Sequence, residues 1–264
     1  MALRYLVTVA IDLTQFEQGA PCAGDYPQAL KALQDRLALL QIAQIVHRKR
    51  ALIIFEGSPG AGKKDVLRHL AAAFDPCHFA THSVGGSDAR DDDRHWLAPF
   101  WSALPPAGDT AIFYHSWYRR LVEERVHARI EDKGWTRACD EINEFEAQQR
   151  DHDTLIVKLY FHVTGDARAA RMRERQDDPW RRHLLSHDDL ADEPNRARTI
   201  EVLHDLFAQT DTRWAPWRVI DAGDSRAARI SALTILTDAM AKAIPAEPPV
   251  AADKVVSIRQ QKSA

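Results

Sequence analysis

The chain has 264 residues, of which 35 are basic, 38 are acidic and three are cysteines. Charge this close to balance excludes a global field that would attract nucleic acid or an anionic membrane surface. Cys22, Cys77 and Cys139 form no C-x-x-C pair, which gives no readable zinc site and is typical of reduced thiols. No apolar run approaches the ~20 residues that span a bilayer, and the N-terminus shows no secretion signal. We therefore expect a cytoplasmic protein without a membrane partner.

Predicted strands and helices alternate along the chain. Residues 1–26 are expected to be irregular, residues 85–94 to form an acidic loop, and residues 245–264 to form a disordered tail. Hydrophobic periodicity predicts strands over 51–55, 79–84, 110–113, 155–163 and 217–222. It predicts helices over 27–45, 63–74, 96–104, 123–131, 140–150, 166–176, 195–209 and 227–244. The alternation predicts an α/β fold, with a mostly parallel sheet and helices on both faces.

A glycine loop joins the first predicted strand to a helix. Gly57 to Lys63 fits the first seven positions of the P-loop (Walker A) pattern G-x-x-x-x-G-K-[ST], but Lys64 stands where a hydroxyl would bind magnesium. Backbone N–H groups, the helix N-terminus and the lysine all favour a bound phosphate. The predicted phosphate-binding residues are Gly57, Ser58, Gly60, Ala61, Gly62, Lys63 and Lys64. The alternative is a tight turn with an exposed lysine.

A second expected feature of such sites is missing. In P-loop enzymes a later strand often ends in an aspartate that helps to hold magnesium. The third predicted strand ends at Tyr114 instead. The loop therefore predicts a phosphate site and leaves the metal unexplained.

Several segments together resemble the polyphosphate kinase 2 family. Its phosphate-loop motif F-E-G-x-D-A-A-G-K-G lies over Phe55–Lys64, and its F-D-R-S-W-Y-N-R motif lies over Phe113–Arg120. Further matches follow in family order over residues 33–244, at Glu124–Val126, Glu141–Glu146, Arg171–Arg175, Asp178–Pro179, Leu185–Ser186, Thr212–Trp217 and Asp224–Arg229. Matches in order and at family spacing are far more specific than a lone phosphate loop.

The resemblance implies a P-loop kinase-like three-layer sandwich over residues 27–244, with a helical lid at about 166–209. It implies phosphoryl transfer between inorganic polyphosphate and a nucleoside mono- or diphosphate, with Mg²⁺, and the family often assembles as a homo-oligomer. The catalytic residues carried over are Lys63, Arg120 and Arg175. The further phosphate- or nucleotide-binding residues are His115, Arg119, Arg125, Arg171 and Arg181.

The chain departs from the family pattern at the two motif aspartates, which are Pro59 and Tyr114 here. His115 and Arg119 also replace an arginine and an asparagine, and a lid lysine and an arginine are Leu184 and Phe100. Lys64 and Arg119 are either cations that bind a polyanion without metal or surface charges. The lid arginines, which include Arg182, either close over phosphates or lie on a solvated helix face.

Other polar and aromatic residues near the motifs have mainly structural interpretations. Glu56, Asp65 and Asp109 are expected to be surface charges rather than substitutes for the missing carboxylates. Glu141 and Glu146 either contact metal or hold an arginine. Core or turn positions are expected for Trp117, Tyr118, Trp214 and Trp217.

Three functional hypotheses follow from these residues. The first is a polyphosphate kinase 2-type phosphotransferase with degenerate metal-binding motifs. The second is a catalytically inactive relative that binds polyphosphate or nucleotide, or serves as a regulatory partner subunit. The third is a P-loop kinase for another small acceptor, which shares only the donor site. The retained motifs favour the first hypothesis, and Pro59 with Tyr114 favours the second. Catalytic activity, the acceptor nucleotide and the direction of transfer are left open by the sequence.

Overall fold

A single parallel sheet forms the centre of the protein. The computed structural model describes residues 10–83, 94–185 and 195–249. The strands among them are β1 (Arg50–Gly57), β2 (Phe79–His82), β3 (Thr110–Tyr114), β4 (Thr154–His162) and β5 (Trp217–Asp221). Their order is β2-β3-β1-β4-β5, and every neighbouring pair is parallel. This confirms the predicted α/β fold and all five predicted strands, although Val84 lies outside the described residues.

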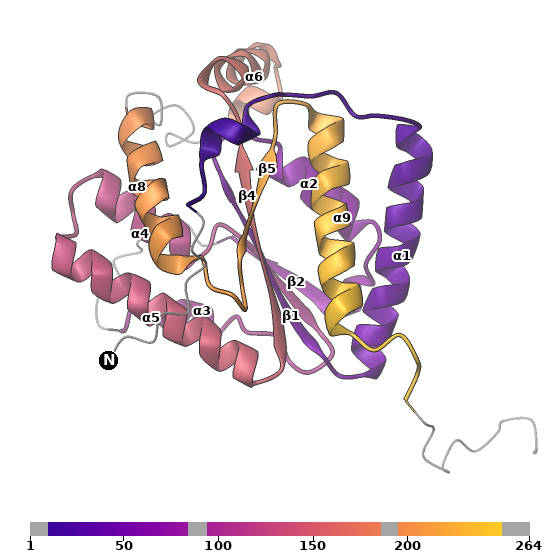
Figure 1. Ribbon diagram of the computed structural model, residues 1–264. Helices are drawn as coiled ribbons and strands as arrows, with labels where there is room; N and C mark the ends of the chain where they lie inside the picture. The colour runs from indigo at the N-terminus through magenta and orange to yellow at the C-terminus, as the bar shows by residue number, and fades with distance from the viewer. Residues whose placement is uncertain (1–9, 84–93, 186–194, 250–264) are drawn as a thin grey trace, which may run out of the picture.

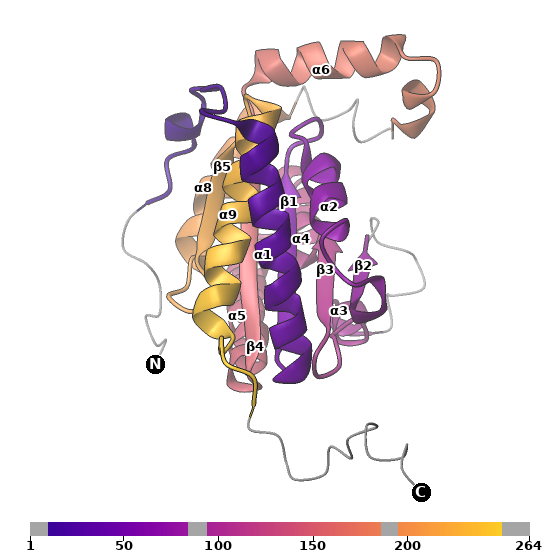
Figure 2. The same ribbon diagram turned by 90° about the vertical axis from the view of Figure 1, so that its right-hand side faces the viewer.

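Helices cover both faces of the sheet (Figures 1 and 2). One layer contains α1 (Tyr26–Val46), α2 (Lys63–Ala71) and α9 (Ser225–Ala243), and the other contains α3 (Ala98–Trp101), α4 (Trp117–Val126), α5 (Asp132–Asp151) and α8 (Arg196–Thr210). Along β1, Leu52 and Ile54 enter one core while Ile53 and Phe55 enter the other. Burial on both faces explains why the strand is a continuous apolar run.

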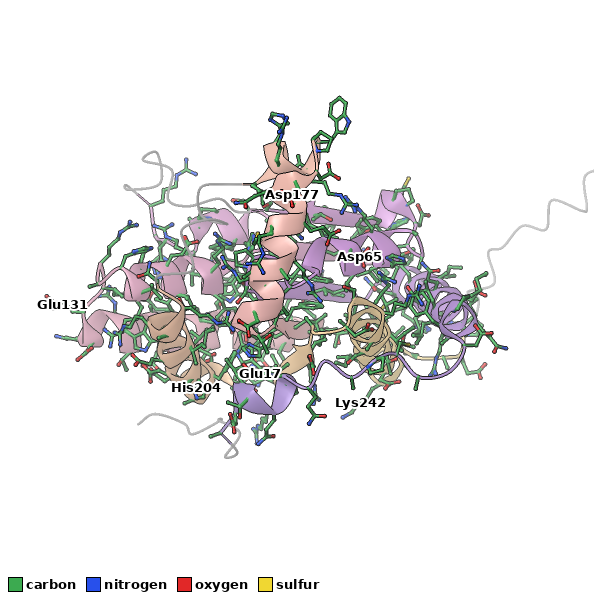
Figure 3. The ribbon with its side chains drawn as sticks, turned by 90° about the horizontal axis from the view of Figure 1, so that it is seen from above. Glu17, Asp65, Glu131, Asp177, His204 and Lys242 are labelled. Carbon is green, nitrogen blue, oxygen red and sulfur yellow. The ribbon has the colours of Figure 1, made fainter. Side chains whose placement is uncertain are left out.

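One further helix, α6 (Gly165–Asp177), lies across the carboxyl ends of the strands (Figure 2). Seen from above, it crosses the middle of the molecule, between Asp65 of α2 on one side and His204 of α8 on the other (Figure 3). The helix ends before Pro179, as predicted, and a 3-10 turn follows at Arg181–Leu184.

Two helices begin earlier in the structure than the sequence predicts. The helix predicted over 123–131 is α4, which starts at Trp117 because the Ser116 hydroxyl caps it by accepting a hydrogen bond from the Tyr118 N–H. Its predicted end was also wrong, since Ala128 has a positive φ of 53° in the turn that follows. The helix predicted over 140–150 starts at Asp132, and the one predicted over 96–104 is helical only at Ala98–Trp101.

The N-terminal segment lies along the ends of β4 and β5. Within its described part, residues 10–25, a 3-10 turn at Leu13–Phe16 is followed by Glu17, whose Oε1 lies 2.8 Å from His162 Nε2. The Gly19 N–H donates to Asp221 Oδ2 at 2.7 Å. The predicted acidic loop over 85–94, apart from Arg94, and the part of the predicted tail beyond 249 lie outside the described residues. No described helix combines the length and apolarity that crossing a membrane requires.

A buried ion pair joins the sheet to the helices on one face. Lys158 of β4 and Glu146 of α5 are 3.0 Å apart and both fully buried. The Lys158 ammonium also donates to the Tyr118 hydroxyl at 2.9 Å and to the Thr210 carbonyl at 2.8 Å. Burial lowers the pKa of Lys158, and the negative charge of Glu146 opposes this shift. Burial and the same negative charge both raise the pKa of Tyr118. The cluster thus connects β4, α4, α5 and α8.

We expect removal of one ion-pair partner to destabilise the fold more than removal of both. Lys158→Met should lower the free energy of unfolding by about 3–5 kcal/mol because it leaves Glu146 buried without its cation. The double variant Lys158→Met/Glu146→Leu should lose clearly less free energy of unfolding than Lys158→Met, because no buried charge is left unpaired. Urea unfolding of the three proteins measures this difference. A double variant less stable than Lys158→Met would contradict the prediction.

Candidate phosphate site and adjoining pocket

The phosphate loop connects β1 to α2 and needs glycine at its first position. Gly57 has a φ of 132°, and a Cβ atom there would lie 2.3 Å from the carbonyl oxygen of Phe161 in β4. Gly60 and Gly62 also have positive φ values, of 81° and 86°. A side chain at Gly57 would therefore force β1 and β4 apart, whereas glycine lets the chain leave the sheet and turn at once.

Lys63 is the first residue of α2, and its side chain turns back into the loop. It is only 3% exposed. Its ammonium group donates to the carbonyl of Gly57 and, at 3.1 Å, to that of Ser58. Its Nζ lies 5.8 Å from the centre of the Tyr114 ring, and the Nζ of the exposed Lys64 lies 5.5 Å from it. Both lysines predicted to bind phosphate are thus beside the loop.

The carboxylate closest in sequence to the loop has a structural role. Glu56 is 6% exposed, so the expectation of a surface charge was wrong. Its Oε1 accepts hydrogen bonds from both the N–H and the hydroxyl of Ser116, each at 2.7 Å. Burial would raise the pKa of Glu56, but hydrogen bonds from His115 and Ser116 outweigh it and lower the pKa. This ionised carboxylate fixes the start of α4 against the end of β1.

His115 lies between that carboxylate and a guanidinium group. It has a φ of 71°, unusual for a residue other than glycine. Its Nδ1 is 3.9 Å from Glu56 Oε2, and its Nε2 is 3.3 Å from Nη1 of Arg119, which pairs with Glu123 at 2.6 Å. Burial lowers the pKa of His115, and the charges of Lys63 and Arg119 lower it further against the opposing effect of Glu56.

Helix α6 is tied to the loop through Arg171. This side chain donates to the Gly60 carbonyl at 3.0 Å and to those of Ala222 and Gly223 at 2.7 and 2.8 Å. The structure therefore places Arg171 at the loop, with its guanidinium group bound to backbone. Arg175 lies one turn further along α6. Arg181 is mostly exposed beside Glu174 and Asp178, at 3.9 and 3.5 Å.

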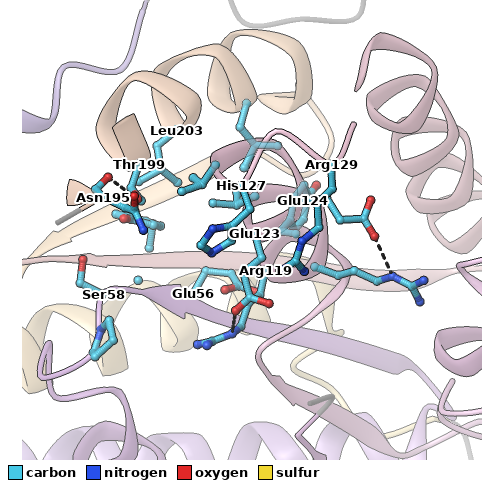
Figure 4. Close-up of a pocket in the computed structure, with 18 of the residues that line it drawn as sticks. Glu56, Ser58, Arg119, Glu123, Glu124, His127, Arg129, Asn195, Thr199 and Leu203 are labelled. Carbon is cyan, nitrogen blue, oxygen red and sulfur yellow. Dashed lines mark hydrogen bonds and ion pairs between the residues drawn. The ribbon is translucent and has the colours of Figure 1, made fainter. Parts of the chain in front are cut away.

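A pocket of about 570 Å³ adjoins the loop on the side of α4 and α8. Gly57, Ser58 and Pro59 form part of its wall, and Tyr118, Tyr160 and Trp217 are among its apolar lining. Figure 4 shows charged side chains of α4 facing the start of α8 across it. The polar residues that line it are Glu56, Ser58, Arg119, Arg120, Glu123, Glu124, His127, Arg129, Asn195 and Thr199.

Sequence reasoning predicted only part of this arrangement. The structure brings Arg119 and Arg120 to the pocket, but Arg125 lies at the α4–α5 corner, where it donates to the Ile130 carbonyl and to Asp132. Glu123, His127, Arg129, Asn195 and Thr199 were missed. The only available signal was the i,i+4 spacing of Arg119 with Glu123 and Arg120 with Glu124, at 2.6 and 3.3 Å.

The glutamates of the third matched motif do not reach the loop. Glu146 holds Lys158 rather than an arginine. Glu141 does hold an arginine, since its Oε1 lies 3.3 Å from Nε of Arg137, and its Oε2 accepts a hydrogen bond from the Trp96 indole N–H at 2.6 Å. Asp65 pairs with Arg229, and Asp109 lies 2.8 Å from His78. The expected core positions of Trp117, Tyr118 and Trp217 are confirmed.

A magnesium ion at the loop, which the family resemblance implies, would lack both motif aspartates, because these positions are Pro59 and Tyr114 here. Such an ion takes oxygen ligands, commonly one or two carboxylates with phosphates and water. Within residues 10–83, 94–185 and 195–249, no group of three acidic, histidine or cysteine side chains is placed to hold a metal. Glu56 is engaged by Ser116, and the ring of Tyr114 has two ammonium groups near it.

Comparison with known proteins gives one consistent result. The family model described as polyphosphate kinase 2 matches residues 22–248. The polyphosphate:AMP phosphotransferase of Pseudomonas syringae pv. tomato is 31% identical over 219 residues, 83% of this chain and 44% of that protein. The ADP-polyphosphate phosphotransferase 2 of Rhizobium meliloti is 29% identical over 84% of this chain and 72% of its own length.

A solved structure agrees with the sequence matches. The crystal structure of polyphosphate kinase 2 from Arthrobacter aurescens superposes with a TM-score of 0.86 at 26% identity, covering 94% of this chain and 90% of that one. The first three curated relatives are longer proteins, and this chain spans 44%, 46% and 43% of their lengths.

Substitution of Gly57 by alanine should destabilise the fold strongly. A Cβ atom there would meet backbone of β4, so we expect a loss of about 3 kcal/mol or more in the free energy of unfolding. Gly24→Ala is a matched control, because Gly24 has a φ of 75° but no atom within 4 Å of the added Cβ. The Gly24→Ala variant should lose only about 1 kcal/mol of the free energy of unfolding. Equal losses in thermal or urea unfolding would contradict the prediction.

Protonation of His115 should weaken the fold in mild acid. Because the pKa of His115 lies below its ordinary value of 6.5 in the folded protein, the unfolded chain binds more protons as the pH falls below that value. The free energy of unfolding should therefore decrease in this range. His115→Asn, which tolerates a positive φ, should show a shallower decrease. Equal slopes for both proteins in urea unfolding at several pH values would exclude the contribution of His115.

Proposed function

The chain belongs to the polyphosphate kinase 2 family, and we propose that it transfers a phosphoryl group between inorganic polyphosphate and a nucleoside mono- or diphosphate. The observation that carries this proposal is that one wall of the polar pocket is formed by Gly57, Ser58 and Pro59 of the phosphate loop. A phosphate in the loop and a nucleotide in the pocket would therefore be neighbours. The printed activities of the relatives, polyphosphate:AMP and ADP-polyphosphate phosphotransferase, support the same substrates.

The phosphate loop is proposed to hold the polyphosphate end. Phosphoryl transfer depends mainly on positioning and on neutralising charge. The N-terminus of α2 directs backbone N–H groups and positive potential to the loop, as Lys63 does with its ammonium group. In the structure Lys63 donates to two loop carbonyls. An arriving phosphate oxygen would offer this ammonium a charged acceptor in their place.

The pocket beside the loop is proposed to receive the nucleotide. Its aromatic lining can contact an apolar base or sugar face, while Arg119, Arg120 and Arg129 supply positive charge for phosphates. Arg120 and Glu124 both line the pocket, where Arg120 is 20% exposed and its Nε lies 3.3 Å from Glu124 Oε1. We assign Arg120 the task of holding the transferred group opposite Lys63.

The lid is proposed to consist of α6 and the turn after it. Helix α6 lies across the carboxyl ends of the strands, where the phosphate loop also lies. The helix and the turn after it carry Arg175, Arg181 and Arg182. Helix α8, which the sequence-based range 166–209 includes, buries Val202, Leu203, Leu206 and Phe207 in the core. This packing favours a fixed α8 and a shorter lid. The 27–244 domain range, a cytoplasmic location and homo-oligomer assembly stay predictions.

The proposed reaction can be tested directly. Purified protein with magnesium and polyphosphate should convert at least one nucleoside mono- or diphosphate to its phosphorylated product, resolved by chromatography. Lys63→Ala should lower the rate ~100-fold or more, since it removes a cation that faces the transferred phosphate.

Because Lys63 also bonds the loop, the variant's thermal unfolding must match that of the wild type for the comparison to count. Lys242→Ala, at the end of α9, serves as the matched control and should keep the wild-type rate. No product from any nucleotide would reject the phosphotransferase and leave the inactive binding protein. An equal rate for a folded Lys63→Ala would remove Lys63 from the site.

A further inference from the structure

The turn that follows β5 is held by one carboxylate. Asp221 is the last residue of β5 and is paired with His162 at the end of β4. Its Oδ1 accepts a hydrogen bond from the Gly223 N–H at 2.8 Å, and its Oδ2 accepts one from the Gly19 N–H at 2.7 Å. Hydrogen bonds to a carboxylate are stronger than those between neutral groups. This side chain therefore joins the turn firmly to the N-terminal segment, residues 10–25.

The carbonyl groups of the same turn hold α6. Nη2 of Arg171 in α6 donates to the carbonyls of Ala222 and Gly223 at 2.7 and 2.8 Å. Its Nη1 donates to the carbonyl of Gly60 in the phosphate loop at 3.0 Å. Because the N–H groups of a guanidinium group have fixed directions in one plane, the position of the two turn carbonyls determines where Arg171 meets the loop.

The N-terminal segment lies in close contact with this turn. A Cβ atom on Gly223 would lie 2.5 Å from Cα of Gly19, so the two backbones leave no space for a side chain. The segment is attached again by Glu17, whose Oε1 lies 2.8 Å from Nε2 of the buried His162, shortly before α6 begins at Gly165. Figures 1 and 2 show the segment passing beside the start of α6. The segment thus contacts the ends of both strands that lead to α6 and to the turn.

We propose that Asp221 is a positioning residue for the phosphate site and that residues 10–25 belong to the site through it. Asp221 fixes the turn against Gly19, and the carbonyls of the turn hold Arg171 at the phosphate loop. Without this carboxylate the turn loses both hydrogen bonds, so α6 and the loop should open more easily. The inference rests on the proposed function, in which the loop holds polyphosphate and the adjoining pocket receives the nucleotide.

Hydrogen–deuterium exchange of the full chain, followed by mass spectrometry, tests the positioning without any reaction. In Asp221→Ala, peptides of the phosphate loop and α6 should exchange about tenfold faster than in the wild type, while those of α5 should not change. Asp75→Ala is the matched control. Its carboxylate accepts the Cys77 N–H at 2.9 Å just before β2, at the opposite end of the sheet, so its loss should leave the loop and α6 unchanged.

Gly223→Ala tests the contribution of the N-terminal segment. The added Cβ displaces Gly19 while the Asp221 carboxylate is retained. Exchange should become faster in the loop and α6 as well as in residues 10–25. If either variant speeds exchange only in residues 10–25, the segment is attached to the site without positioning it and the inference fails. Faster exchange throughout the chain, α5 included, would indicate a general loss of stability and would also overturn it.

Kinetics measure the effect on the proposed reaction. Asp221→Ala should lower kcat/KM for polyphosphate about tenfold and leave the KM for the nucleotide unchanged, because the pocket is lined mainly by the loop, α4 and α8. Asp221→Asn keeps one acceptor oxygen and should recover part of the loss. In an Arg171→Ala background, Asp221→Ala should have no further effect, because Asp221 acts through Arg171. Additive losses in the double variant would contradict the inference.

The two measurements separate this inference from the proposed function. Unchanged exchange in the loop and α6, together with nucleotide product, rejects the positioning role and leaves the phosphotransferase. Faster exchange there without product from any nucleotide supports the positioning role and rejects the phosphotransferase. If exchange is unchanged and no product forms, both fail.

Discussion

The site depends on a backbone contact between the two central strands. β1 and β4 are paired over eight positions, and the last of these sets Gly57 against Phe161. The space there admits no Cβ, with the Phe161 carbonyl 2.3 Å from where one would lie. This contact fixes the point at which the chain leaves the sheet and hence the position of the loop. The same close approach brings the loop to the pocket, which is partly lined by Tyr160 of β4.

A second constraint connects the loop to α4. The carboxylate of Glu56 holds both polar hydrogens of Ser116, and Ser116 in turn caps α4 through its hydroxyl. Arg119 and Arg120 follow within the first turn of that helix, so their approach to the pocket is set by this cap. A carboxylate beside a phosphate loop suggests metal binding, but here its hydrogen bonds show it fixing a helix start. His115 and the two hydrogen bonds from Ser116 together lower the pKa of this carboxylate.

The sequence predicted the sheet well and the charged site less well, for physical reasons. Strands buried on both faces are continuous apolar runs, so β1 and β4 were visible without any knowledge of their neighbours. The start of α4 was missed because the aromatic residues Trp117 and Tyr118 mask the helical pattern that a serine cap begins. Asn195 and Thr199 face the pocket only because α8 packs against α4, a long-range contact that local spacing does not contain. Burial of Glu56 depends on Ser116, 60 positions away.

The departures from the family motifs are easier to understand together than singly. Tyr114 alone would remove a ligand from a metal site, and Lys64 alone would add charge where a metal already supplies it. With both present, the Tyr114 ring lies near the two ammonium groups. Arg171 contributes in a different way, since its bonds to Gly60, Ala222 and Gly223 satisfy backbone carbonyls that would otherwise present negative ends beside the loop. Each of these features makes the surroundings of the loop more favourable for a bound anion.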